Sequence, residues 1–156
     1  GRGAVGAFGQ RFKGEAIVME DVGVSIQSAF DKDGLNLSDA QILDVFAGYV
    51  HALLAAADIS EDRFVLHRDV SMGNLMVGDN GAPYVIDWGC GRVCSVDETV
   101  RSCGKEMIGT AIYMGIRVLG NCKTRSVIDD LESLFLVLCH SLTSLVLIRD
   151  WMHLIG

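Results

Sequence analysis

The sequence lacks the residues that mark fibrous, linker-like or cross-linked proteins. It has one proline, 7% aromatic residues and five cysteines, an odd number in which no CxxC pair occurs. A single proline among scattered glycines excludes collagen-like and proline-rich chains. The cysteine spacing predicts neither a disulfide framework nor a zinc site. We therefore expect free thiols, no disulfides and an intracellular protein, either cytoplasmic or nuclear.

Positive charge is also scarce, with 13 lysines and arginines against 20 acidic residues and a formal net charge of −7. This balance argues against nucleic acid and anionic membranes as partners, because both attract basic surfaces. The most apolar stretch, residues 134–148, is short for a bilayer span and contains polar side chains, so we expect a buried helix there. Apolar residues make up 50% of the chain, enough for the core of one compact domain or part of a larger one.

Short runs rich in β-branched and aromatic residues predict strands. These runs cover residues 15–22, 64–66, 75–77 and 84–86. Between the last two runs, residues 78–81 tolerate positive φ angles, which favours a turn and therefore an antiparallel hairpin.

Two helices are predicted from their start signals and from apolar periodicity. Ser38 and Gln41 have the spacing of a capping box, and apolar residues then recur every three or four positions up to Leu54. A second helix should begin near Ser126, because acidic residues in its first turns favour the positive end of the helix dipole. Residues 90–125 are polar, rich in glycine and without periodicity, so we expect a long functional loop there.

Three oxygen-bearing side chains lie at the ends of predicted neighbouring strands, namely Asp69, Asn74 and Asp87. Such ligands suit Mg²⁺, which usually completes its coordination with substrate phosphates rather than with a full protein cage. Two carboxylates at one edge would repel each other unless a cation lies between them. The three residues therefore predict a magnesium site used for phosphoryl transfer.

Two of these stretches match known motifs. Residues His67–Asn74 spell HRDVSMGN, which fits the protein-kinase pattern HRDxxxxN, and Asp87–Gly89 spell DWG, which resembles DFG. By this resemblance, Asp69 is the catalytic residue that orients the attacking hydroxyl. Asn74 and Asp87 would then hold the Mg²⁺ ions that bridge the phosphates of ATP.

Residues 18–22 are similar to the hinge of protein kinases. The resemblance implies that Met19 is the gatekeeper and that the backbones of Glu20 and Val22 contact adenine. Met76 would form the floor of the same nucleotide pocket.

Later segments extend the resemblance. Residues 109–114 (GTAIYM) resemble the end of the activation segment, where Thr110 would hydrogen-bond Asp69 and contribute to catalysis. Residues 130–134 (DLESL) resemble the start of the central large-lobe helix, whose aspartate, here Asp130, would hold the backbone of the catalytic loop. Together, HRDVSxGN, GTxxYM and DDLESLF are most similar to the fungal-type protein kinase domain family.

Several positions depart from the family pattern. Ser71 stands where many Ser/Thr kinases have a lysine that faces the transferred phosphate, and Trp88 replaces the usual phenylalanine. Gly115, Ile116 and Arg117 replace Ala-Pro-Glu. The usual Glu–Arg anchor therefore cannot form, and Arg117 must find an acidic partner of its own.

The resemblance also implies upstream parts that the sequence does not show. A kinase needs a Gly-rich flap, a strand lysine and a helix glutamate before the hinge. Residues 1–6 spell GxGxxG, but they and Lys13 lie too close to the hinge to serve as these parts. We therefore expect a partial kinase domain, in which residues 1–24 are the end of the small lobe and the hinge. Residues 25–156 would form the large lobe through its central buried helix.

The resemblance thus implies an α+β, protein kinase-like fold, mostly the helical C-terminal lobe with the hinge strand, the small N-terminal lobe being largely missing. The implied function is Mg²⁺-dependent transfer of the γ-phosphate of ATP to Ser or Thr hydroxyls of a protein substrate. A small-molecule phosphotransferase of the aminoglycoside or choline type is one alternative, and an inactive remnant that binds proteins is another. The GTxxYM and DDLESL segments favour a protein substrate, because in the family they build the peptide-docking platform.

Overall fold

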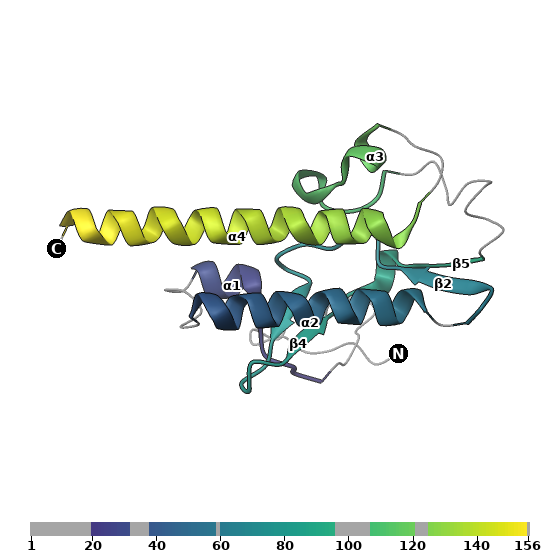
Figure 1. The fold of residues 1–156 in the computed structure, drawn as a ribbon, viewed down its shortest axis with the longest axis horizontal. Helices are drawn as coiled ribbons and strands as arrows, with labels where there is room; N and C mark the ends of the chain where they lie inside the picture. The colour runs from purple at the N-terminus through teal and green to yellow at the C-terminus, as the bar shows by residue number, and fades with distance from the viewer. Residues whose placement is uncertain (1–19, 32–37, 59, 96–106, 121–124, 156) are drawn as a thin grey trace, which may run out of the picture.

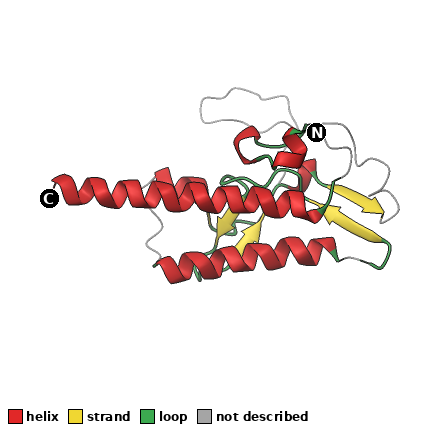
Figure 2. Cartoon of the chain, turned by 45° about the horizontal axis from the view of Figure 1, so that its top comes forward, coloured by secondary structure: helices red, strands yellow, loops and turns green. Residues whose placement is uncertain are grey.

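The computed structural model describes residues 20–31, 38–58, 60–95, 107–120 and 125–155 of the chain. Two long helices, α2 (Asp39–Ala57) and α4 (Val127–Ile155), run side by side in opposite directions, and short strands lie against them (Figures 1 and 2). The far end of α4 extends beyond α2 (Figure 1). This mixture of helices and sheets confirms the predicted α+β class.

Helix α2 begins where the capping box predicts. The Ser38 hydroxyl accepts a hydrogen bond from the Gln41 amide, and the Gln41 side chain accepts one from the Ser38 amide at 2.9 Å. One face of the helix is buried through Ile42, Val45, Phe46, Tyr49 and Leu53. The helix is long and apolar enough to span a membrane. It packs against β2 (Arg63–Leu66), β4 (Pro83–Val85) and α4, which accounts for the apolar residues of its buried face.

Helix α4 starts next to the predicted position. Among its described side chains, Leu134 and Val137 are buried, whereas Phe135 is 61% exposed. The helix is therefore confirmed, but the prediction that residues 134–148 are buried is wrong for its outer face. The reason is that the neighbouring elements, α2, β2 and the 3-10 turn η3 (Ala111–Tyr113), do not cover the whole circumference of the helix.

The predicted hairpin is confirmed, with its second strand shifted by one residue. Strand β3 (Leu75–Val77) pairs antiparallel with β4 (Pro83–Val85), with Met76 opposite Tyr84. The turn between them has a φ of 78° at Gly81, a left-handed conformation that glycine adopts without strain.

One predicted strand is wrong in the part that the structure describes. Residues 20–22, the end of the strand predicted at 15–22, form no strand, and the remainder lies outside the described residues. The chain instead enters the sheet at β1 (Val24–Ser25), which pairs antiparallel with β3. Gly23 makes this entry with a φ of 125°, and a Cβ there would collide with the carbonyl oxygen of Val77. The short helix α1 (Ile26–Asp31) follows.

The sequence predicts a loop over residues 90–125, but regular elements occupy much of its described part. Their bounds are η1 (Trp88–Cys90), β5 (Arg92–Ser95), η3 (Ala111–Tyr113) and α3 (Ile116–Leu119). Strand β5 pairs antiparallel with β2 (Arg63–Leu66). These elements are too short to show a period, and β5 depends on a partner strand far away in sequence, so the local pattern did not reveal them.

The main core lies between α2, α4 and the hairpin. The HRD loop, which we define as residues His67–Asn74, leaves β2 at Leu66 and enters β3 at Leu75. Leu66 and Leu75 are 1% and 0% exposed. Leu75 belongs to the main core, and Leu66 to a second, smaller cluster with Cys94. Buried packing therefore fixes both ends of the loop, which restricts where its polar side chains can lie.

Candidate active site

The carboxylate of Asp69 is held by a residue that is distant in sequence. Its Oδ1 atom accepts two hydrogen bonds from Thr110, one from the backbone amide at 2.8 Å and one from the hydroxyl at 2.9 Å. The contact between Thr110 and Asp69 that the sequence predicts is therefore present. Because both donors use Oδ1, the other oxygen is the one that can accept a proton from a further group.

Asn74 lies against the same carboxylate and closes the HRD loop. Its Nδ2 atom donates to the backbone oxygen of Asp69 at 2.8 Å and to Asp69 Oδ2 at 3.3 Å. Both amide hydrogens are on Nδ2, so the Oδ1 atom of Asn74 is left for another partner. Asn74 thus stiffens the loop and keeps an oxygen ligand available.

Asp87 lies at the same end of the hairpin as Asn74. The amide of Ile86 donates to the Asn74 carbonyl at 2.9 Å, which places Asp87 one residue beyond this pair. Asp87 has a left-handed backbone, with φ 58° and ψ 63°, and its Oδ1 accepts a hydrogen bond from the Gly89 amide at 3.3 Å. No hydrogen bond between described residues joins its carboxylate to Asp69 or Asn74. The structure therefore brings Asp87 beside Asn74 through the backbone and leaves its side chain exposed.

His67, to which the sequence assigns no chemical role, connects the HRD loop to the end of the hairpin. Its ring is fully buried, Nδ1 accepts from the Asp69 amide at 3.2 Å, and Nε2 donates to the Ile86 carbonyl at 2.9 Å. These two bonds require the neutral tautomer with the proton on Nε2. The Trp88 ring packs edge-on against it, with 4.6 Å between ring centroids. His67 therefore ties the backbone of Asp69 to the end of β4 that carries Asp87.

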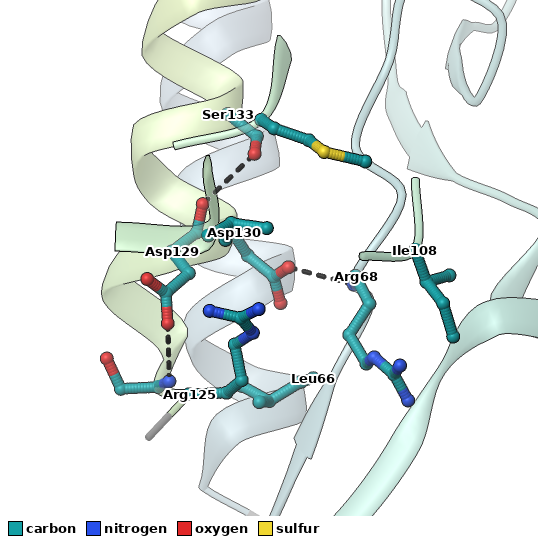
Figure 3. Close-up of a pocket in the computed structure, with 10 residues that line it drawn as sticks. Leu66, Arg68, Ile108, Arg125, Asp129, Asp130 and Ser133 are labelled. Carbon is teal, nitrogen blue, oxygen red and sulfur yellow. Dashed lines mark hydrogen bonds between the residues drawn. The ribbon is translucent and has the colours of Figure 1, made fainter. Parts of the chain in front are cut away.

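Asp130, in the first turn of α4, holds the beginning of the HRD loop. Its Oδ2 accepts the His67 amide at 2.7 Å. Its Oδ1 accepts the Arg68 amide at 2.8 Å, the bond that Figure 3 shows. This anchor is the one predicted from the sequence. Burial raises the pKa of the Asp130 carboxyl above its ordinary value, and the hydrogen bonds from Arg68 and His67 offset part of the rise.

The cavity drawn in Figure 3 lies between α4 and the HRD loop and is lined by Arg68, Arg125, Asp129 and Asp130 among others. Its volume is about 30 Å³. This is room for water and far too small for a substrate, so the cavity belongs to the scaffold behind the site.

The residues predicted to contact the nucleotide base are spread along the hairpin. Glu20 and Val22 lie beside its turn, where they line a groove together with residues 78–80. Met76 lies in the middle of β3, half-buried, and its carbonyl accepts a hydrogen bond from Tyr49 at 2.9 Å. Met76 does not line that groove. The predicted gatekeeper, Met19, lies outside the described residues.

The departures from the motif pattern have clear structural outcomes. Ser71 is buried, so its hydroxyl does not take the exposed position of the usual lysine. Arg117 does find an acidic partner, because its Nε atom lies 3.8 Å from Oδ1 of Asp129. The sequence predicts the need for this partner but not its identity, since Asp129 gave only a helix-dipole signal.

The oxygen donors of the site fit one kind of metal ion. Among the described residues, no group of three or more His, Cys, Asp or Glu side chains could hold a metal. The donors at the hairpin end are the Asp87 carboxylate and the amide oxygen of Asn74. This set fits a Mg²⁺ ion that is bound by one or two protein oxygens and completed by substrate phosphates. It does not fit an ion held by the protein alone.

Known proteins resemble the chain over most of its length. It matches the family described as "Fungal protein kinase" over residues 10–142. It is 30% identical over 99 residues to the probable serine/threonine-protein kinase PknB of Bifidobacterium longum, covering 63% of this chain and 14% of that protein. Serine/threonine-protein kinase PknD of Chlamydia pneumoniae is 25% identical over 135 residues, covering 76% of this chain and 14% of that protein.

A further relative is serine/threonine-protein kinase PknB of Mycolicibacterium smegmatis, which is 30% identical over 99 residues, covering 63% of this chain and 15% of that protein. The chain thus spans 14 to 15% of the length of these curated relatives. The family match covers far more than half of the chain and includes the HRD loop, Asp87 and Thr110. The chain therefore belongs to the fungal protein kinase family.

Proposed function

We propose that the chain forms part of a serine/threonine protein kinase domain that uses ATP and Mg²⁺. Residues 1–24 would be the end of the small lobe and the hinge, and residues 25–156 the large lobe through its central helix. The observation that carries the proposal is the geometry of the Asp69 carboxylate. Thr110 holds one of its oxygens, and the other oxygen lies beside Asn74. The named serine/threonine kinases among its relatives support the same conclusion.

In this proposal, Asp69 orients the attacking hydroxyl. Thr110 fixes Oδ1, so the carboxylate cannot rotate freely, and Oδ2 accepts the hydrogen of a Ser or Thr hydroxyl. A positioned acid–base group of this kind contributes roughly 10² to 10⁴ in rate. Most of the remaining acceleration in phosphoryl transfer comes from positioning and from charge stabilisation.

Asn74 and Asp87 are the proposed ligands of Mg²⁺. When bound, the ion supplies neutralisation of the phosphate charge. Because Ser71 is buried and replaces the usual lysine, the HRD loop contributes no lysine cation at that point. Asn74 and Asp87 hold their oxygens at the hairpin end through the backbone pair that joins Asn74 to Ile86.

The nucleotide is proposed to lie along β3. The backbones of Glu20 and Val22 would bind the base, with Met76 beneath it and Met19 as gatekeeper. The three residues of β3 separate the turn end of the hairpin from Asn74. This is a distance of about 10 Å at the usual rise per residue. A nucleoside triphosphate can span this distance between its base and its outer phosphates.

A protein substrate is favoured over a small molecule by the segment that contains Thr110. This segment continues from the Asp69 contact into η3 and α3, the stretch that in the resembled family builds the peptide-docking platform. We further propose a cytoplasmic or nuclear location. Free thiols at the described Cys90 and Cys139 support it, because thiols stay reduced there.

The decisive experiment is Asp69→Asn in the complete gene product. Transfer of labelled phosphate from ATP to protein should fall by about 10³-fold, while nucleotide affinity stays within a few-fold. Asp44→Asn is the matched control, because Asp44 is exposed on α2 away from the site. Equal transfer by both variants contradicts the role of Asp69. Label on a small molecule, or no label with the unmodified protein, would instead favour the phosphotransferase or the inactive binding module.

A further inference from the structure

Three contacts join the segment that follows Thr110 to α4. The Tyr113 hydroxyl lies 2.8 Å from His140 Nδ1, and Gly115 packs so closely on Glu132 that a Cβ would collide with its carboxylate. At the end of the segment, Arg117 Nε lies 3.8 Å from Asp129 Oδ1. The partners on α4 follow one another in reverse order, so the segment runs along the helix in the opposite direction.

Asp129 connects this segment to the start of α4. Its Oδ2 accepts the Ser126 amide at 2.7 Å, which caps the first turn of the helix. Its Oδ1 is buried and accepts no hydrogen bond from the described residues. The side chain of Asp129 is 7% exposed, against 42% for Arg117. A carboxylate that is this buried needs positive charge nearby, and two arginines are placed to supply it: Arg117 forms the ion pair, and the buried Arg125 lines the same cavity as Asp129.

Asp130, the next residue of α4, holds the side of the site that the HRD loop forms. Asp130 binds the backbone of the HRD loop, and that loop carries Asp69. Adjacent aspartates of one rigid helix turn therefore hold two different segments, the HRD loop and α3. Asp69 and Thr110 meet where these segments come together, so their contact depends on how both are held.

We propose that Arg117 is a positioning residue. Its ion pair with Asp129 fixes α3 on α4 and keeps Thr110 in place on the Asp69 carboxylate. The pair replaces the missing glutamate anchor with one of opposite polarity, in which the segment contributes the cation and α4 the anion. This inference rests on the proposed function only for its effect on phosphate transfer, since the contact with Thr110 can be measured without activity.

The first measurement is hydrogen exchange of the Thr110 amide, which donates to Asp69 Oδ1. Arg117→Gln in the complete gene product should speed this exchange by about fivefold, the upper end expected for losing a partly exposed ion pair. Arg117→Lys keeps the charge and should restore most of the protection. Arg63→Gln, an exposed arginine on β2, is the matched control and should change nothing at Thr110.

A double-mutant cycle separates the pair from general weakening of the fold. Asp129→Asn keeps an oxygen for the Ser126 amide and removes only the charge. In the Arg117→Gln background, Asp129→Asn should add little to the exchange rate of the Thr110 amide, because the ion pair is already lost. Additive effects of the two substitutions, or equal acceleration at the core amide of Tyr49, would overturn the positioning role.

The kinetic readout is the split between kcat and KM. Arg117→Gln should lower kcat for phosphate transfer by up to about fivefold and leave the KM for ATP unchanged, because Thr110 acts on Asp69 and not on the nucleotide. If the unmodified protein transfers no phosphate, the proposed function fails while the exchange experiment still tests Arg117. If it transfers phosphate and Arg117→Gln changes neither kcat nor the exchange, the positioning role fails by itself.

Discussion

The two aspartates of the candidate site are held in opposite ways. Asp69 is half-buried, and Thr110, 41 residues away in sequence, donates both of its hydrogen bonds to one carboxylate oxygen. Asp87 is exposed, and among the described residues its carboxylate bonds only to the amide of Gly89, two residues on. The first arrangement depends on tertiary structure, whereas the second depends on a local turn.

This difference suits the two proposed roles. A group that orients a substrate proton must stay within narrow limits of position, which remote contacts can provide. A ligand of an ion that arrives with its nucleotide can adjust, and an exposed carboxylate on a short turn is able to do so. Changes far from the site should therefore disturb Asp69 more than Asp87.

The largest effect on nucleotide binding is expected where Asp87 itself is removed. Asp87→Ala should weaken Mg²⁺-dependent ATP binding by at least about 100-fold, because one of the proposed protein ligands is lost. Asp69→Asn should leave this binding nearly unchanged. Titration calorimetry with and without Mg²⁺ measures both, and Asp62→Ala, an exposed aspartate beside β2, is the control. Unchanged binding in Asp87→Ala contradicts its role as a ligand.

Removal of the anchor on α4 should disturb the Asp69 side more than the Asp87 side, which is coupled to the anchor through His67. Asp130→Ala leaves two backbone amides of the HRD loop without acceptors and should lower the free energy of unfolding by about 3 kcal/mol in urea denaturation. Asp130→Asn keeps one acceptor, so about half of that loss is expected. Mg²⁺-dependent ATP binding through Asp87 should survive in Asp130→Asn. A loss of stability below about 1 kcal/mol for the alanine variant would show that the anchor matters little.

A smaller effect is expected at Gly109, where the segment of Thr110 passes the HRD loop. Its φ is 114°, and a Cβ there would lie 2.5 Å from the carbonyl oxygen of Arg68. Gly109→Ala should cost about 2 kcal/mol of unfolding free energy and reduce phosphate transfer, since Thr110 would move. Gly81→Ala is the comparison, because Gly81 also has a positive φ, 78°, but no atom lies within 4 Å of the added Cβ. It should cost only about 1 kcal/mol, and equal costs would mean that the close approach to Arg68 is unimportant.

The smallest effect is expected at Trp88, next to Asp87. Its Nε1 donates to the Val85 carbonyl at 3.0 Å, while its ring packs on His67. Trp88→Phe keeps the ring contact and loses the hydrogen bond, so thermal unfolding should report a loss of about 0.5 to 1 kcal/mol. Transfer activity should persist. A loss of ATP binding would show that the turn which carries Asp87 is less self-contained than its contacts indicate.

Features that act within a few residues were predictable. The capping box at Ser38, the hairpin turn ending at Gly81 and the start of α4 each follow from neighbouring side chains, and all three are present. The contacts of Thr110 and Asp130 were also predicted, but from family resemblance rather than from local pattern. The strand expected at residues 15–22 failed in its described part, because apolar composition alone does not supply a partner strand.

Contacts between remote segments were not predictable. Nothing in the local sequence of Arg92–Ser95 shows that it pairs with β2, because a strand needs a partner that the fold brings to it. The exposed side of α4 was missed for the same reason, since only the neighbouring elements decide which of its apolar residues are covered.

The sequence by itself determined which side chains are available for chemistry and which segments fold locally. It placed Asp69, Asn74 and Asp87 at the ends of short strands, because motif and turn signals are read over a few residues. Only the tertiary structure decided that Thr110 occupies Oδ1 of Asp69, and that Asp129 is the partner of Arg117. Such pairings join residues that the chain path and the core packing bring together, and no local rule contains that information.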